Sequence, residues 1–140
     1  MTGTAERVYL ALGSNLGDRE GNLRAAREAL SRLPGTQVLG ASTVEETMPL
    51  GGLAQPAYLN QMVLVETELE PRALLEACQA IENRAGRVRA EHWGPRTLDI
   101  DIVRYGRRRI SEPGLVIPHP GVADRDFWQR ELAELESHER

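Results

Sequence analysis

The feature that most restricts the fold is a strict alternation of apolar and polar residues just after position 96. The chain reads Thr-Leu-Asp-Ile-Asp-Ile-Val from Thr97 to Val103. A period of two is typical of a β-strand with one apolar and one polar face. Asp99 and Asp101 are therefore expected on the same face, about 7 Å apart along a strand that ends near Tyr105.

Length and composition set broad limits on the class of protein. The 140 residues are enough for one domain with its own core, so residues 1–140 are treated as a single domain. A 41% hydrophobic and 27% charged composition is typical of a soluble globular protein, and a net charge of −4 argues against a general nucleic-acid or membrane binder. No apolar run is long enough for a membrane span, and no signal peptide is visible. The lone Cys78 favours a cytoplasmic location and is expected to be a buried small residue, not a nucleophile.

The order of strand and helix patterns predicts the fold class. Strands are expected at 8–12, 37–47, 58–69 and 97–105, helices at 19–33, 71–85 and 124–136, a hairpin turn at 106–108 leading to a short strand near 109–110, and a loop at 111–123. Asp18 is expected to cap the first helix, and Pro71 to open the second. This order predicts an α+β fold with a ferredoxin-like βαββαβ core. An antiparallel sheet is packed with helices on one face, and a C-terminal hairpin and helix follow.

Asp99 and Asp101 are the first candidates for chemistry. Two carboxylates held close together suit a hard divalent cation, and oxygen ligands suit Mg²⁺. The alternative is a solvated acidic pair on an exposed strand face. Arg87, Arg89 and Arg96 lie just upstream, and this mixture of acids and cations is expected where Mg²⁺ meets a polyphosphate.

The absence of lysine narrows the ways in which phosphate can be bound. All 17 basic residues are arginine, which excludes a P-loop lysine, a Schiff-base lysine and a lysine general base. Neither a GxxxxGK[ST] nor a GxGxxG motif is present. Any phosphate contacts must therefore come from arginine side chains, metal ions and backbone amides.

Two further sets of polar residues have both a functional and a structural interpretation. Gln79 and Glu82 share a helix face and could contact a ribose or an adenine, although exposed helix residues need no such role. His119 lies between two prolines and could be positioned to contact a phosphate, but a structural histidine is an equal alternative.

The segment around residues 47–60 could bind a flat polar heterocycle. Thr47, Leu50, Tyr58 and Asn60 bracket a loop rich in proline and glycine. A hydroxyl, an aromatic ring and an amide can bind such a ring by stacking and hydrogen bonding. The simpler alternative is the end of one strand and the start of the next.

Taken together, these motifs resemble the 6-hydroxymethyl-7,8-dihydropterin pyrophosphokinase family of folate biosynthesis. The signature runs from Trp93 to Ile102. The accompanying segments are Leu12–Gly17, Pro49–Gly51, Tyr58–Asn60, Gly86–Arg89, and Ile117–Pro120 with Arg125 and Phe127. The matches follow one another in order over residues 8–127, which makes the set far more specific than any one segment.

The resemblance implies an activity and a set of site residues. The activity is transfer of a pyrophosphoryl group from ATP to the hydroxymethyl oxygen of the reduced pterin, releasing AMP. Two Mg²⁺ ions are implied at Asp99 and Asp101. The implied ATP contacts are Gln79, Glu82, Arg87, Arg89, Arg96, Ile102, His119 and Arg125. The implied pterin pocket is Thr47, Leu50, Tyr58, Asn60, Trp93 and Phe127. Arg87, Arg89 and Arg96, with the two aspartates, would be the catalytic residues, because the transition state spreads negative charge.

Two other classes of protein are weighed against an enzyme. One is a ferredoxin-like regulatory module that binds a nucleotide or a metal without turnover. The other is a nucleic-acid-binding module, which the net charge and the single phenylalanine disfavour. The expected partners are small-molecule substrates, with no nucleic acid and no membrane, and the expected state is a monomer.

Overall fold

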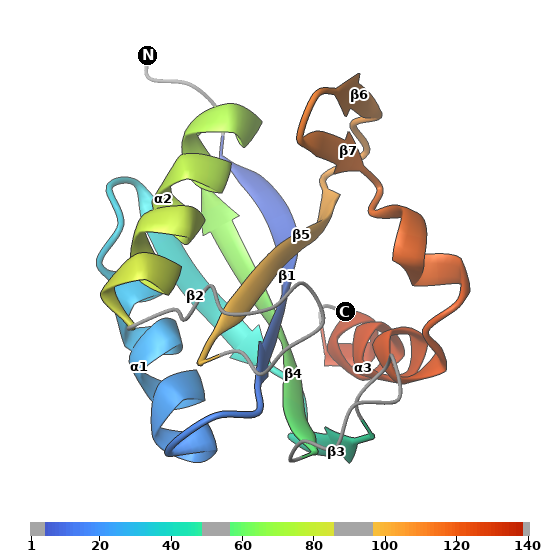
Figure 1. The fold of residues 1–140 in the computed structure, drawn as a ribbon. Helices are drawn as coiled ribbons and strands as arrows, with labels where there is room; N and C mark the ends of the chain where they lie inside the picture. The colour runs from blue at the N-terminus through green and yellow to red at the C-terminus, as the bar shows by residue number, and fades with distance from the viewer. Residues whose placement is uncertain (1–4, 49–56, 86–96, 139–140) are drawn as a thin grey trace.

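The chain folds around an antiparallel sheet (Figure 1). A computed structural model describes residues 5–48, 57–85 and 97–138. Its elements are β1 (Glu6–Ser14), α1 (Arg19–Ser31), β2 (Thr36–Ala41), β3 (Glu45–Thr47), β4 (Tyr58–Thr67), α2 (Pro71–Arg84), β5 (Asp99–Tyr105), β6 (Ile110–Glu112), β7 (Leu115–Ile117), a 3₁₀ helix (Pro120–Ala123) and α3 (Asp126–His138). The predicted α+β class is confirmed.

The position of each strand in the sheet explains its sequence pattern. The strand order is β2-β4-β1-β5, with antiparallel pairing between neighbours. β3 also pairs with β4, along its first residues, whereas β2 pairs with the later residues of β4. The central strands β1 and β4 are buried on both faces, which explains their nearly continuous apolar runs. The outer strand β5 alternates between buried and partly exposed residues, as its period of two predicts.

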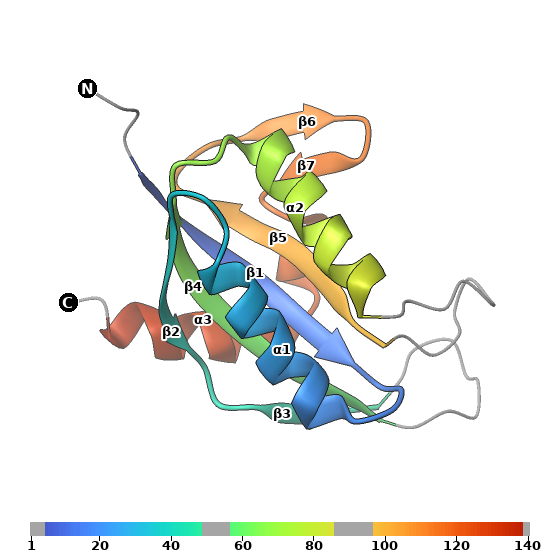
Figure 2. The same ribbon diagram turned by 90° about the vertical axis from the view of Figure 1, so that its left-hand side faces the viewer.

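Helices cover both faces of the sheet. Figure 2 shows α1 and α2 on one face and α3 on the other. The first face is filled by apolar residues of α1, α2 and the sheet, including Leu23, Leu30, Leu74 and Ile102. The second is filled mainly by Tyr9, Met62, Leu64, Trp128, Leu132 and Leu135. Burial of each large side chain stabilises the fold by about 1.5–3 kcal/mol. The sequence predicted α3 but not its position on the opposite face.

Local signals for the helix boundaries are confirmed. Asp18 accepts a hydrogen bond from the backbone N of Gly21 at 3.1 Å, which caps α1. Pro71 begins α2. Cys78 is fully buried on α2, and burial raises the pKa of its thiol to about 12. Cys78 is therefore a packing residue, as predicted. None of the helices in the described ranges is long and apolar enough to cross a membrane.

The predicted continuous strand at 37–47 is wrong, because the chain breaks between β2 and β3. The side chain of Ser42 compensates for this break. Its Oγ accepts a hydrogen bond from Met62 N at 2.9 Å, and Ser42 N donates to Met62 O at 2.8 Å. A side-chain oxygen thus replaces a main-chain acceptor of the ladder. The strand-like composition of the segment contains no signal for this exchange.

The predicted turn at 106–108 is present, with Arg108 N donating to Tyr105 O at 3.0 Å, and a short strand follows it, but this turn does not form the C-terminal hairpin. The sequence indicated a turn at 106–108, whereas β6 pairs with β7, and the hairpin turn lies at Pro113 and Gly114, where Gly114 has φ +76°. Residues 111–123 are therefore not a plain loop, because they include most of β6, all of β7 and the 3₁₀ helix. Gly106 also has a positive φ, so both glycines mark turns, and local signals do not say which strands then pair.

Candidate functional site

The register of three strands brings the central residues of the site into rows. Gly13 on β1 pairs with Asn60 on β4 and with Asp99 on β5. Ala11 forms the next row on the same face with Met62 and Asp101. Directly paired residues of antiparallel strands point to the same face, so an amide and two carboxylates flank a strip of small residues.

Gly13 leaves the centre of this site without a side chain. A Cβ atom placed on Gly13 would lie 3.5 Å from Asn60 Oδ1 and 3.6 Å from Tyr58 Cδ1. The absence of a Cβ at Gly13 therefore leaves room beside the side chains of Asn60 and Tyr58. Because Ala11 and Met62 pack with α3, this space lies on the face that α3 covers in part.

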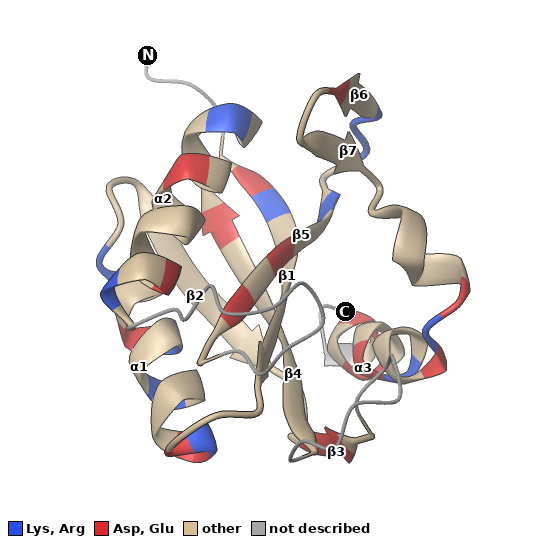
Figure 3. Ribbon diagram, in the orientation of Figure 1, with Lys and Arg blue, Asp and Glu red and all other residues tan. Residues whose placement is uncertain are grey.

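Asp99 and Asp101 have the arrangement that the sequence predicted. Both are partly exposed, whereas Ile100 between them is buried on the other face, and the side chain of Asp101 is 43% exposed. Figure 3 shows these acidic positions along β5. Within residues 5–48, 57–85 and 97–138, no group of three or more histidine, cysteine or acidic side chains could form a closed metal site. Two partly exposed carboxylates fit Mg²⁺, which takes one or two protein carboxylates and completes its shell with water and substrate phosphates.

His119 is held beside Asp101 by its own backbone and ring. Its N–H donates to Val103 O at 2.9 Å, and its Nδ1 accepts a hydrogen bond from Gly121 N at 2.9 Å. Its Nε2 therefore carries the proton of the neutral ring, and this atom lies 3.9 Å from Asp101 Oδ1. Burial lowers the pKa of His119, the Asp101 carboxylate opposes that shift, and Arg125 adds to it. The structural and functional interpretations of His119 are thus compatible.

Trp128 organises the other candidates near His119, and the sequence analysis did not single it out. The indole is 3% exposed and contacts the His119 ring edge-on at 5.0 Å between centroids. The guanidinium carbon of Arg125 lies 4.4 Å from the centre of the indole, and the Phe127 ring lies 6.3 Å away. In the sequence, Trp128 had only the signal of an apolar helix residue.

The three described candidates for the heterocycle pocket lie together on β3 and β4. Asn60 Nδ2 donates a hydrogen bond to Thr47 Oγ1 at 2.6 Å. Tyr58 is the partner of Thr47 in the β3–β4 ladder. The amide of Asn60 is thus held with Nδ2 toward Thr47 and Oδ1 toward Gly13.

The candidates associated with α2 differ from one another in exposure. Gln79 is exposed, whereas Glu82 is only 6% exposed, and its Oε2 accepts a hydrogen bond from Ile100 N at 2.6 Å. Glu82 therefore joins α2 to the outer edge of β5. The side chain of Ile102 is 5% exposed in the core, so a ligand could reach this residue only through its backbone.

Asn22 is a site-supporting residue that the sequence analysis missed. Its Nδ2 lies 3.1 Å from Ser14 Oγ, 3.0 Å from Leu16 O and 3.2 Å from Thr97 O. It thereby links the end of β1, the turn before α1 and the residue two positions before Asp99. Asn22 lies in the first turn of α1, and no sequence pattern indicated this contact.

Five predicted site residues lie outside the described residues: Leu50, Arg87, Arg89, Trp93 and Arg96.

Fold and site together define an α+β protein whose antiparallel sheet carries an amide and two partly exposed carboxylates on one face. The family model of 7,8-dihydro-6-hydroxymethylpterin-pyrophosphokinase matches residues 9–137. The chain belongs to this family.

Individual relatives extend over most of the chain. Proteins called 2-amino-4-hydroxy-6-hydroxymethyldihydropteridine pyrophosphokinase are 44% identical in Methylorubrum extorquens (92% of this chain, 82% of the relative) and 43% in Pseudomonas aeruginosa (93% and 80%). The Bacillus subtilis protein of that name is 44% identical over 91% of this chain and 77% of its own length.

Proposed function

We propose that the chain transfers the pyrophosphoryl group of ATP to the hydroxymethyl oxygen of 6-hydroxymethyl-7,8-dihydropterin, giving AMP and the pterin diphosphate. Membership of the pyrophosphokinase family supports the reaction. The observation that carries the assignment to this site is the row Asn60–Gly13–Asp99. It sets an amide suited to a pterin beside a carboxylate suited to a metal–phosphate complex.

The acidic side of this row would hold the nucleotide phosphates. Asp99 and Asp101 would bind two Mg²⁺ ions, and the bound metal would neutralise phosphate charge and align the triphosphate with the pterin alcohol. His119 offers its Nε2–H to an oxygen near Asp101, and Arg125 supplies positive charge near His119. At the outer edge of β5, Gln79, Glu82 and the backbone of Ile102 would contact the rest of ATP.

The polar side of the row would bind the pterin. Asn60 would accept a hydrogen bond from the ring edge through Oδ1, because one N–H of its Nδ2 already donates to Thr47 Oγ1 and holds the amide in this direction. Tyr58 offers an aromatic ring beside Gly13 for stacking. Leu50, Trp93 and Phe127 would complete the pocket.

Catalysis in this scheme depends on position and charge. Arg87, Arg89 and Arg96 would stabilise the negative charge that spreads over the transferred group in the transition state. Attack by the pterin alcohol on the β-phosphorus needs no covalent enzyme intermediate. A chain without lysine must use arginine for this purpose.

The test is a product analysis with ATP, Mg²⁺ and the hydroxymethyl dihydropterin. We expect AMP and pterin diphosphate in equal amounts, and no AMP when the pterin or Mg²⁺ is omitted. ADP would indicate an ordinary kinase. Nucleotide binding without any product would indicate the regulatory module.

We further propose that residues 1–140 act as one domain and as a monomer in the cytoplasm. Both apolar clusters pack on the same sheet, which supports a single folding unit. Light scattering of the purified chain tests the monomer.

A further inference from the structure

Glu131, on the sheet-facing side of α3, is a buried acid with no obvious role in the proposed reaction. Its side chain is 2% exposed. Among the residues that the structure describes, neither of its carboxyl oxygens has a hydrogen-bond partner. A buried carboxylate left in this state is costly, because it has lost its hydration without gaining a donor. The group must therefore gain a proton or a partner.

The groups around Glu131 identify the partner. They are Glu45 on β3, and Arg130 and Glu134 on α3. Burial is the main reason that the pKa of Glu131 rises to about 8. The neighbouring Glu45 carboxyl, which could accept a hydrogen bond only from a protonated Glu131, raises that pKa further by this interaction and by charge repulsion. Arg130 acts in the opposite direction, and Glu134 adds to the rise. Two ionised carboxylates cannot hydrogen-bond to each other. One proton on Glu131 supplies the missing donor.

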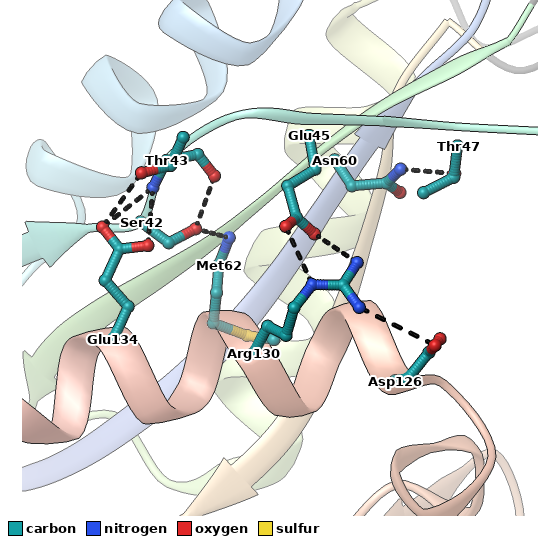
Figure 4. Close-up of polar contacts among 9 residues, drawn as sticks. All are labelled: Ser42, Thr43, Glu45, Thr47, Asn60, Met62, Asp126, Arg130 and Glu134. Atoms are coloured by element: carbon teal, nitrogen blue, oxygen red, sulfur yellow. Dashed lines mark hydrogen bonds and ion pairs between the residues drawn. The ribbon is translucent and has the colours of Figure 1, made fainter.

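Glu45 is the member of this pair that already has hydrogen-bond donors. Arg130 donates to both of its carboxyl oxygens, at 3.2 and 3.3 Å, and Arg130 lies 3.7 Å from Asp126 (Figure 4). The donor that is missing from the pair is therefore missing at Glu131. A proton on Glu131 would thus complete a carboxyl pair between α3 and β3, in which Arg130 supplies the donors for Glu45.

This pair lies next to the residues proposed to bind the pterin. Glu45 is the ladder partner of Asn60, and Thr47, two residues further along β3, accepts the Asn60 amide (Figure 4). β3 has only three residues, so a bond that fixes Glu45 also restricts Thr47 and the direction of the Asn60 amide. Glu134 holds the preceding segment by accepting from Thr43 N at 3.1 Å.

We propose that Glu131 holds a proton at neutral pH and donates it to Glu45, and that this buried pair positions Thr47 and Asn60 for pterin binding. Glu131 is a positioning residue, because it acts through Glu45 and β3 and does not contact substrate. The positioning role rests on the proposed function, whereas the shared proton does not.

The first experiment detects the proton without any assay of activity. Infrared difference spectra of wild type against Glu131→Gln should contain one carboxylic-acid carbonyl band at neutral pH, which disappears as the pH rises above about 8. The free energy of unfolding should show the matching dependence. The native state holds a proton that the unfolded state releases, so this contribution is present in acid and is lost between about pH 5 and 8. Glu131→Gln should lack that slope. No such band, or an unchanged slope in the variant, would overturn the shared proton.

The second experiment tests positioning through the pterin KM. Glu131→Gln keeps a donor at every pH, so its pterin KM should stay near the wild-type neutral value and should not rise in alkali as that of wild type does. Glu131→Leu lacks the donor, and its pterin KM should rise about fivefold at pH 7, with kcat and the ATP KM nearly unchanged. Glu136→Gln, which removes an exposed carboxylate paired with Arg104, should keep the wild-type profile. Equal KM values for the Gln and Leu variants would overturn the positioning role. If the wild-type protein forms no AMP, the proposed function is refuted, but the proton measurements remain valid.

Discussion

At the level of single residues, the carboxylates of β5 and the glycine of β1 contribute to the proposed site in different ways. Asp101 is open to solvent on one side and faces His119 on the other. Gly13 contributes the absence of a side chain. The two therefore call for opposite substitutions, one that removes a charge and one that adds a carbon atom.

Asp101→Asn should remove most of the activity and leave the fold intact. The amide keeps the size of the side chain but loses the charge that would attract a divalent ion. Because a bound metal supplies several kcal/mol to phosphoryl transfer, kcat should fall by about 10²–10⁴-fold. The side chain is 43% exposed, so the free energy of unfolding should change by less than about 0.5 kcal/mol. AMP formation by Asp101→Asn at near the wild-type rate would disprove the metal assignment, and the same comparison applies to Asp99→Asn.

Gly13→Ala should separate stability from pterin binding. The new methyl group meets Asn60 and Tyr58 at ordinary contact distances, so the fold should accept it, with a change of about 0.5–1 kcal/mol in the favourable direction. The same methyl occupies the floor of the proposed pocket, and the pterin KM should rise about tenfold while the ATP KM stays constant. Urea unfolding and steady-state kinetics measure the two effects.

Gly40→Ala is the matched control. Gly40 is also a strand glycine, and a Cβ placed on it would lie 3.6 Å from Leu135 Cδ2, far from the row of site residues. It should change stability in a similar way and leave both KM values unaltered. A pterin KM in Gly13→Ala equal to that of Gly40→Ala would exclude Gly13 from the pocket.

At the scale of elements, the site depends on how α2 is attached to the outer edge of β5. An outer strand has N–H groups that point away from the sheet, and Glu82 accepts one of them, that of Ile100. Ile100 lies between Asp99 and Asp101 in the chain. Glu82 therefore fixes the strand that carries the proposed metal ligands, whatever contact it also makes with ATP.

Glu82→Ala should weaken the attachment of α2 to β5. The buried N–H of Ile100 would lose its acceptor, which costs about 1–3 kcal/mol in the free energy of unfolding. Glu82→Gln keeps an oxygen acceptor and should lose less. Glu76→Ala, an exposed glutamate of the same helix, should change stability by less than about 0.5 kcal/mol.

Cys78 provides a second measurement of the same attachment. Its thiol is buried on α2 with a pKa of about 12, so it should react with a thiol reagent only when α2 opens. Glu82→Ala should accelerate that reaction under native conditions, and Glu76→Ala should not. An unaltered thiol reactivity in Glu82→Ala would mean that this hydrogen bond does not hold the helix.

For the whole molecule, short-range patterns predicted most of the elements, and long-range pairing decided the rest. The alternation at 97–102, the cap at Asp18 and the helix start at Pro71 are local signals, and the structure confirms them. The break at Ser42 depends on Met62, twenty residues away, and the hairpin depends on which strand β6 selects. No local pattern contains that information.

The same distinction applies to the site. Asp99 and Asp101 are two positions apart in one strand, so periodicity alone placed them on one face. The alignment of Asn60 with Asp99 across Gly13 requires the register of three strands. The roles of Trp128, Asn22 and Glu131 arise from packing between elements that are distant in the chain.

Because β4, β1, β5 and the C-terminal segment all contribute to one face, ligands on that face should stabilise the entire chain. A ligand at about 100 times its Kd adds about 2.7 kcal/mol to the free energy of unfolding. For a chain of this size, a non-hydrolysable ATP analogue with Mg²⁺ should therefore raise Tm by about 8 °C in a calorimetric scan. EDTA should abolish the increase, and Asp101→Asn should show little of it, since both remove the metal bridge to the triphosphate. The pterin added without nucleotide is the control for the pterin side of the site. The rise in Tm that it causes should be insensitive to EDTA. An equal rise in Tm with the ATP analogue in the presence of EDTA would mean that the nucleotide binds without Asp99 and Asp101, and the proposed arrangement of the site would fail.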